Sequence, residues 1–250
     1  MPEILFPAAD EFSLVADRVH LHAASLENAE QQAATCIHLL SNDEREKASR
    51  YRFNIDRARY IVGRGTLRIL LGRYLQIPPE QLQFKYGLHG KPALDHPQES
   101  SQLHFNLTHS HDLAVYAFSL NRNTGIDIEA VRPLPDLFDV AALHFSKAEI
   151  ASLKSLPESK QPQAFFNCWT RKEAYLKAHG GGINDHLREI TVSLLPEEPA
   201  QLIEVAYDPE EASKWELAAF TPATGYIGAV AVEHTSMPWT LHKSQVTEYD

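Results

Sequence analysis

Cysteine is scarce in this chain of 250 residues: there are only two, Cys36 and Cys168, and they stand far apart. Neither belongs to a CxxC pair, so a disulfide or a zinc site has little support and a reducing cytoplasm is the expected location. The first residues lack the basic-then-apolar order of a signal peptide. No apolar run approaches the roughly 18 residues that a membrane helix needs. We therefore expect a soluble cytoplasmic protein that does not enter a membrane.

Positive charge is also in short supply, since 23 lysines and arginines face 33 aspartates and glutamates, for a net charge of −10. This balance argues against a general nucleic-acid binder. One stretch, from Arg45 to Arg73, is nevertheless basic and holds only two acids, Glu46 and Asp56. Its basic residues are Arg45, Lys47, Arg50, Arg52, Arg57, Arg59, Arg64, Arg68 and Arg73. Such a run on a helix is usually a solvated face. In an otherwise acidic chain it also favours a place where an anion binds.

The composition, 44% hydrophobic and 22% charged, predicts a folded core in one large domain or two small ones. Apolar periodicity predicts helices over residues 28–40, from 41 onward, 56–75 and 163–179. Strands are predicted over residues 19–24, 82–86, 103–107, 113–120, 125–129, 189–194, 201–207, 215–220, 226–232 and 239–244.

The predicted elements come in two similar series, each a short helix, a long helix and then strands. Each series contains a capping-box pattern, Ser41 to Glu44 in the first and Ser146 to Glu149 in the second. Three glycines, 180–182, are the predicted stop of the long second-series helix. We therefore expect a duplicated α+β unit with halves at residues 1–130 and 131–250.

The segment Gly125-Ile126-Asp127-Ile128-Glu129 is the first candidate for chemistry. Side chains alternate along a strand, so the two isoleucines point to a core while Asp127 and Glu129 share the other face. Neighbouring carboxylates repel one another unless a cation or solvent separates them. Mg²⁺ takes one or two carboxylates together with water and phosphate oxygens. A metal site and a solvated edge strand both fit this pattern.

The helix around Trp169-Thr170-Arg171-Lys172-Glu173 is the second candidate. Glu173 and Lys177 are four residues apart in the favourable order, which is commonly a surface pair worth about 0.2–0.5 kcal/mol. The functional alternative gives them separate roles, with Glu173 as metal ligand or base and Lys177 as a cation that faces a phosphate.

Two further segments place polar or charged side chains in predicted turns. Phe105-Asn106-Leu107-Thr108-His109-Ser110-His111 is an apolar strand that breaks into a polar turn, without the G-x-S-x-G elbow of a hydrolase. His109 is most simply structural, with a phosphate contact as the alternative. Gly87 to Pro92 is a predicted hairpin turn from which Lys91 would project as a point charge for phosphate. Gly63-Arg64-Gly65 is too short for a P-loop or a Rossmann fingerprint.

In this order and spacing, the segments resemble the 4′-phosphopantetheinyl transferases of the Sfp type. The matching pieces are Gly90-Lys91-Pro92, Phe105-Asn106-Leu107-Thr108-His109-Ser110, Gly125-Ile126-Asp127-Ile128-Glu129 and Trp169-Thr170-Arg171-Lys172-Glu173-Ala174-Tyr175-Leu176-Lys177-Ala178. The resemblance implies a monomeric α+β protein whose two similar subdomains are related by a pseudo-twofold, with coenzyme A in the cleft between them. It implies transfer of the phosphopantetheine arm to a serine of an acyl- or peptidyl-carrier protein, with release of adenosine 3′,5′-bisphosphate.

The resemblance also implies roles for individual residues. Asp127, Glu129 and Glu173 would hold Mg²⁺, and Lys177 would neutralise or protonate the leaving phosphate. Glu173, or a water relayed by Glu129, would accept the proton of the serine. The nucleotide end of coenzyme A would meet His109 and Lys91, and its 3′-phosphate would meet Arg45, Lys47, Arg52 and Arg59.

Two other classes of function remain open at this point. One is a different metal-dependent enzyme that acts on nucleotides or on coenzyme A. The other is a catalytically silent module that binds coenzyme A or a carrier protein. Because carrier proteins are usually acidic and this chain is acidic too, we expect a transient docking surface built on an apolar patch with local basic residues.

Overall fold

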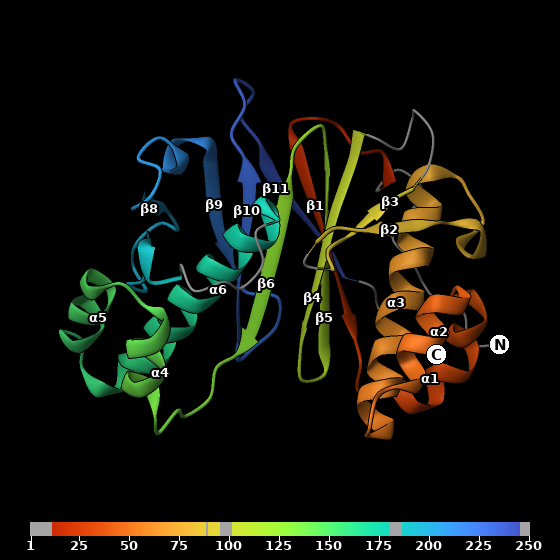
Figure 1. Cartoon of the computed structure of the whole chain (residues 1–250), viewed down its shortest axis with the longest axis horizontal. Helices are drawn as coiled ribbons and strands as arrows, with labels where there is room; N and C mark the ends of the chain where they lie inside the picture. The colour runs from red at the N-terminus through yellow and green to blue at the C-terminus, as the bar shows by residue number, and fades with distance from the viewer. Residues whose placement is uncertain (1–11, 89, 96–101, 181–186, 246–250) are drawn as a thin grey trace.

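The computed structural model describes residues 12–88, 90–95, 102–180 and 187–245. The elements form four layers, with two sheets back to back in the middle and helices outside each sheet (Figure 1). The outer helices on one side are α1 (Ala29–Cys36), α2 (Asn42–Ser49) and α3 (Asn54–Leu75). Those on the other side are α4 (Leu137–His144), α5 (Lys147–Lys154) and α6 (Gln161–His179). The predicted α+β class is confirmed.

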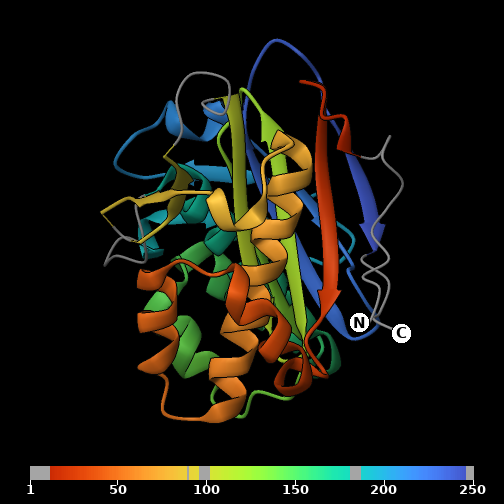
Figure 2. The ribbon, with the colours of Figure 1, turned by 90° about the vertical axis from the view of Figure 1, so that its right-hand side faces the viewer.

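The first sheet has the order β11-β1-β5-β4 and the second the order β6-β10-β9. The first is built from β1 (Arg18–Ser25), β4 (Leu103–Ser110), β5 (Leu113–Leu120) and β11 (Thr240–Gln245). The second is built from β6 (Thr124–Ala130), β9 (Trp215–Phe220) and β10 (Tyr226–Glu233). Two small hairpins complete the fold, β2 (Phe84–Tyr86) with β3 (Pro92–Leu94) and β7 (Ile190–Val192) with β8 (Leu202–Val205). Seen from the side, α1–α3 lie in front of the first sheet (Figure 2).

Strand β5 shows why the layers stack in this way. Ala114, Tyr116 and Phe118 belong to the core beneath α1–α3, while Val115 and Ala117 belong to the core between the two sheets. A strand buried on both faces needs apolar residues at successive positions. The run Leu-Ala-Val-Tyr-Ala-Phe supplies them.

Strand β6 alternates between two environments as the sequence predicted. Ile126 and Ile128 are buried in the core between the sheets. Gly125, Asp127 and Glu129 therefore face the α6 layer. A Cβ atom on Gly125 would lie 2.2 Å from both the Ala174 carbonyl oxygen and the Ala178 nitrogen, so the backbones of β6 and α6 touch at this glycine.

The predicted elements are mostly confirmed, with shifted ends. Both capping boxes are present, at the starts of α2 and α5. Gly180 has the left-handed φ of +83° that ends α6, while glycines 181 and 182 lie outside the described residues. Helix α4 was not predicted. Phe138 and Leu143 are exposed while Leu137 and Ala141 are buried, so its apolar residues form no single stripe that periodicity could detect.

The expected boundary at residue 130 and the pseudo-twofold relation stay predictions. Strand β6, which precedes that boundary, is antiparallel to β10. Strand β11, from the end of the chain, lies parallel to β1 with Thr240 opposite Arg18. Among the described residues, the helices are all too short or too polar to cross a membrane.

Candidate active site

The side chain of Asp127 lies at the centre of a polar cluster between β6, β4 and α6. Its Oδ1 atom accepts a hydrogen bond from Thr108 Oγ1 at 2.9 Å and forms an ion pair with Lys177 Nζ at 2.6 Å. The Lys177 ammonium is also 3.4 Å from Thr108 Oγ1. Asp127 is 5% exposed, so its charge is held almost entirely by these partners. The structure thus brings together Asp127 and Lys177, which are 50 residues apart in sequence.

Glu129 follows Asp127 on the same face of β6 and is partly exposed. Its Oε2 atom accepts a hydrogen bond from Ser110 Oγ at 2.9 Å and lies 3.6 Å from Arg132 Nη1. The Ser110 hydroxyl also accepts a hydrogen bond from the Ala130 N–H at 3.2 Å. Glu129 is therefore oriented from one side by β4 and still reaches solvent from the other.

Glu173 projects from α6 toward the same place and is 6% exposed. Burial raises the pKa of this carboxyl to about 7, and the charges of Asp127 and Glu129 push the pKa in the same direction against the opposing effect of Lys177. The three carboxylates therefore lie close enough to repel one another. A site of this kind favours a proton or a cation.

Strand β4 supplies three polar side chains that sequence reasoning passed over. Asn106 accepts a hydrogen bond from the Ile126 N–H at 2.9 Å, Thr108 donates to Asp127, and Ser110 donates to Glu129. All three are buried. The strand was predicted to end at Leu107 because the residues after it are polar, yet it continues to Ser110 since Thr108 and Ser110 find partners on β6. The sequence signal that could have identified them is their spacing of two residues, which places all three on one face of a strand.

His109 lies beside this cluster. Partial desolvation by the surrounding protein, together with the charges of Lys177 and Arg59, lowers the pKa of its imidazole, although the side chain is still exposed. The side chain of Lys91 reaches the start of β6 and the last turn of α6. Its ammonium donates to the carbonyl oxygens of Thr124 at 3.0 Å, Lys177 at 2.5 Å and Ala178 at 3.3 Å.

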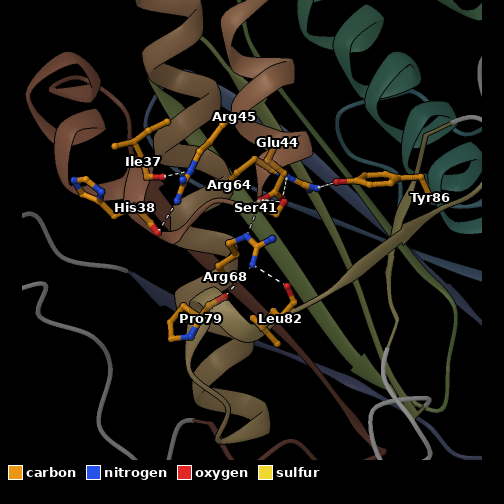
Figure 3. A network of polar contacts seen from close by, with 10 residues as sticks. All are labelled: Ile37, His38, Ser41, Glu44, Arg45, Arg64, Arg68, Pro79, Leu82 and Tyr86. Carbon is orange, nitrogen blue, oxygen red and sulfur yellow. Dashed lines mark hydrogen bonds and ion pairs between the residues drawn. The ribbon is translucent and has the colours of Figure 1, made fainter.

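The basic stretch divides into buried and exposed parts. Arg64 Nε and Arg68 Nε donate to the two oxygens of Glu44, at 3.0 and 2.7 Å, inside the protein (Figure 3). Arg64 also donates to the Tyr86 hydroxyl at 2.8 Å, which ties α3 to the β2–β3 hairpin. Because two guanidinium groups share one carboxylate, this network keeps a net positive charge.

The four predicted 3′-phosphate residues are not gathered at one point. Arg45 donates to the carbonyl oxygens of Ile37 and His38 at the α1–α2 connection (Figure 3). Lys47 lies 5.6 Å from the centre of the Tyr60 ring. Arg52 lies over the Phe53 ring, and Arg59 forms an ion pair with Asp112.

A pocket of about 580 Å³ opens between α2, α3 and the hairpin. It is lined by Lys47 and Arg50, by Tyr51, Tyr60 and Tyr86, and by Asp43, Glu44, Glu46 and Gly90. Of the four predicted residues only Lys47 lines it. Arg50, which the sequence analysis left without a role, is at its wall.

The donor atoms suit a hard cation, although they are not converged on one. In the described part of the chain, no three His, Cys, Asp or Glu side chains stand together as a ready metal site. Lys177 occupies one oxygen of Asp127 instead. Two other oxygens, Asp127 Oδ2 and Glu173 Oε1, are buried without a hydrogen-bond partner. Unpaired carboxylate oxygens are costly unless a proton or a cation meets them, so the residues fit a divalent ion.

Comparison with known proteins gives matches along most of the chain. A family model described as the 4′-phosphopantetheinyl transferase superfamily matches residues 123–231, and one described as 4′-phosphopantetheinyl transferase, N-terminal, matches residues 26–121. The 4′-phosphopantetheinyl transferase HetI of Nostoc sp. (strain PCC 7120) is 41% identical over 226 residues, which cover 90% of this chain and 92% of HetI.

Two further relatives come from bacilli. The 4′-phosphopantetheinyl transferase psf-1 of Bacillus pumilus is 34% identical over 184 residues, 74% of this chain and 76% of its own. The 4′-phosphopantetheinyl transferase Sfp of Bacillus subtilis (strain 168) is 28% identical over 199 residues, 80% of this chain and 84% of its own.

Proposed function

Since this chain belongs to the 4′-phosphopantetheinyl transferase family, we propose that it moves the phosphopantetheine arm of coenzyme A onto a serine of an acyl- or peptidyl-carrier protein. The serine oxygen attacks the phosphorus that bears the pantetheine. The bond from that phosphorus to the bridging oxygen breaks, and adenosine 3′,5′-bisphosphate leaves. The observation that carries this proposal is the ion pair of Asp127 with Lys177 between β6 and α6, with Glu129 and Glu173 near enough for the charges to act on one another.

We propose that Asp127, Glu129 and Glu173 hold Mg²⁺. The partnerless oxygens of Asp127 and Glu173 support this assignment. When bound, the ion would supply positive charge that offsets the charge of the pyrophosphate. Thr108 and Ser110 orient the carboxylates of Asp127 and Glu129 through the hydrogen bonds that they donate.

Glu173 and Lys177 are the side chains proposed to take part directly in proton transfer and charge neutralisation. Glu173 has a pKa raised to about 7, close to the value that favours proton transfer near neutral pH, so it is the proposed acceptor of the serine proton. A carboxylate that binds a metal is a weaker base, and a water oriented by Glu129 is the alternative acceptor. The Lys177 ammonium neutralises or protonates the leaving phosphate.

The nucleotide end of coenzyme A is proposed to lie along α2, α3 and the hairpin. Lys47 at the wall of the pocket and the excess positive charge of the Arg64–Glu44–Arg68 network support this placement, and Arg59 stays a proposed contact. Arg45, Arg52 and His109 remain proposed contacts as well, whereas the ammonium of Lys91, expected from the sequence to meet the nucleotide, is held by three backbone carbonyl oxygens. Lys91 and Arg45 would have to give up carbonyl partners to reach a phosphate.

Incubation with coenzyme A, Mg²⁺ and a set of apo carrier proteins tests the proposed function. We expect each accepted carrier to gain the mass of one phosphopantetheine arm, read by intact-protein mass spectrometry. A carrier whose acceptor serine is alanine should gain nothing. If no carrier in a set from fatty acid, polyketide and peptide synthesis gained mass, the transferase proposal would be wrong. The silent coenzyme A-binding module, which the comparisons do not support, would then be the better description.

Mg²⁺ should raise the melting temperature of the protein, and more at about pH 8 than at about pH 6, because a protonated Glu173 binds metal poorly. Without metal, the contribution of Glu173 to the stability of the folded protein decreases as pH rises. The folded pKa of Glu173, about 7, exceeds the ordinary 4.5, so its protonation stabilises the folded state at low pH. That stability is lost as pH rises from about 4.5 to about 7. Thermal melts with Mg²⁺ and with a chelator, at both pH values, measure both effects.

The Asp127→Asn variant is the control for these melts, and it should show little response to Mg²⁺. An equal response in that variant would place the ion elsewhere.

The remaining expectations about the setting also stand as proposals. The protein is proposed to act as a monomer in the cytoplasm and to meet its carrier protein through a transient interface. Cys36 and Cys168 are free and buried, which agrees with a reducing compartment.

A further inference from the structure

The ammonium of Lys91 joins three backbone segments that are distant in sequence. The lysine immediately precedes β3. The hairpin around it is closed by the hydrogen bond from the Gly87 N–H to the Lys91 carbonyl oxygen at 2.9 Å. From there its side chain reaches the carbonyl oxygens of Thr124, Lys177 and Ala178. Thr124 is the first residue of β6, and the other two belong to the last turn of α6.

The end of α6 needs such a partner. The last four carbonyl groups of a helix have no donor inside the helix, and their dipoles favour a positive charge nearby. In α6 the Gly180 N–H satisfies the carbonyl of Leu176 at 2.9 Å. The Lys91 ammonium serves the next two carbonyls, those of Lys177 and Ala178. An ammonium has three protons to donate, and here three carbonyl oxygens accept them.

The two elements joined in this way carry the proposed active site. Lys177 offers its carbonyl to Lys91 and its side chain to Asp127, at 2.5 and 2.6 Å. Thr124 precedes Gly125, where β6 and α6 are in backbone contact. Lys91 therefore lies where a small slip of α6 along β6 would move Lys177 away from Asp127.

We propose that Lys91 is a positioning residue, which holds the last turn of α6 against the start of β6 and so keeps Lys177 in register with Asp127. The inference rests on the proposed function and concerns how its site is held. A direct phosphate contact by Lys91 would require the ammonium to release one of its carbonyl partners. Burial also lowers the pKa of Lys91 to about 8, which agrees with an ammonium enclosed by backbone.

The test is the Lys91→Met variant, which keeps the length of the side chain and removes its donors. We expect kcat for carrier modification to fall by at least about tenfold, since a misplacement of about 1 Å can cost a hundredfold. The KM for coenzyme A should change by less than about twofold, because no substrate contact is lost. Lys85→Met, the same substitution at an exposed site on β2 of the same hairpin, is the matched control and should leave both constants unchanged.

The opposite split would overturn the inference. If Lys91→Met raised the KM for coenzyme A and left kcat intact, Lys91 would be a nucleotide contact. If neither constant changed, it would have no role in the reaction. Should Lys91→Met fail to fold, Lys91→Arg separates the same alternatives. An arginine can still meet a phosphate, whereas its larger planar group would have to displace carbonyls that enclose the ammonium at 2.5–3.3 Å.

Hydrogen exchange provides a measurement that does not depend on activity. In Lys91→Met, the amides of the last turn of α6, residues 176–180, should exchange at least about tenfold faster than in the parent, while Lys85→Met should match the parent. Unchanged exchange would contradict the inference. If the parent protein modified no carrier but this exchange difference appeared, the proposed function would be wrong, while the role of Lys91 in holding the end of α6 would stand.

Discussion

The Asp127→Asn variant is expected to lower kcat for carrier modification by at least about a hundredfold, the loss typical when charge stabilisation of a transition state is removed. Asparagine has nearly the size of aspartate and can still accept the hydrogen bond from Thr108. The variant therefore removes the charge that pairs with Lys177 and contributes to the proposed metal site. The measurement is the rate of mass gain of an apo carrier at saturating coenzyme A.

The matched control is Asp17→Asn, the same substitution at an exposed position just before β1. It should leave the rate unchanged. The melting temperature of Asp127→Asn must be measured alongside, so that a loss of fold is not mistaken for a loss of chemistry. A well-folded Asp127→Asn enzyme with the parent rate would exclude Asp127 as an essential residue and with it the proposed site.

Gly125→Ala should cost more than about 3 kcal/mol in the free energy of unfolding, at or beyond the upper end for overpacking. The new methyl group would lie 2.2 Å from the Ala174 carbonyl oxygen and from the Ala178 nitrogen, so β6 and α6 would have to separate. Backbone atoms on both sides cannot move aside as a side chain can. Urea denaturation measures the loss, and the rate of carrier modification should fall because Asp127 and Lys177 move apart.

Gly63→Ala is the control for this experiment. Its methyl group would find Tyr116 Oη as the nearest atom, at 3.9 Å, within helix α3. Alanine is favoured over glycine inside a helix by about 0.5–1 kcal/mol, so this variant should be as stable as the parent or more so. Equal stability of the two variants would show that β6 and α6 can separate without cost, which would contradict the close packing described above.

Local patterns predicted the elements that carry the carboxylates. The alternation in β6 put Asp127 and Glu129 on one face, and the spacing in α6 put Glu173 and Lys177 on one side of a helix. Both features depend on residues within a few positions of one another, so a single sequence contains them. That β6 and α6 would meet through Gly125 could not be predicted, because the glycine is explained only by the helix behind it.

Long-range partners explain what the sequence analysis missed. The arginines between residues 45 and 73 were interpreted as one surface, but Arg64 and Arg68 point inward to Glu44. A buried guanidinium is costly unless hydrogen-bond acceptors lie beside it, here the carboxylate of Glu44, and the hydrophobic pattern does not show where that carboxylate comes from. Lys91 is similar, since its carbonyl partner at Lys177 is 86 residues away. Helix periodicity has no access to such distances.

The pairing of β11 with β1 makes the first sheet depend on both ends of the chain. A gene fragment that stopped before residue 240 would leave β1 with an open row of N–H and C=O groups along one side. Such an unpaired edge is a template for intermolecular β-pairing and aggregation. A split at residue 130 would likewise remove β6 from β10. Truncation or splitting for expression studies therefore has to respect these two strand pairings, whichever half is wanted.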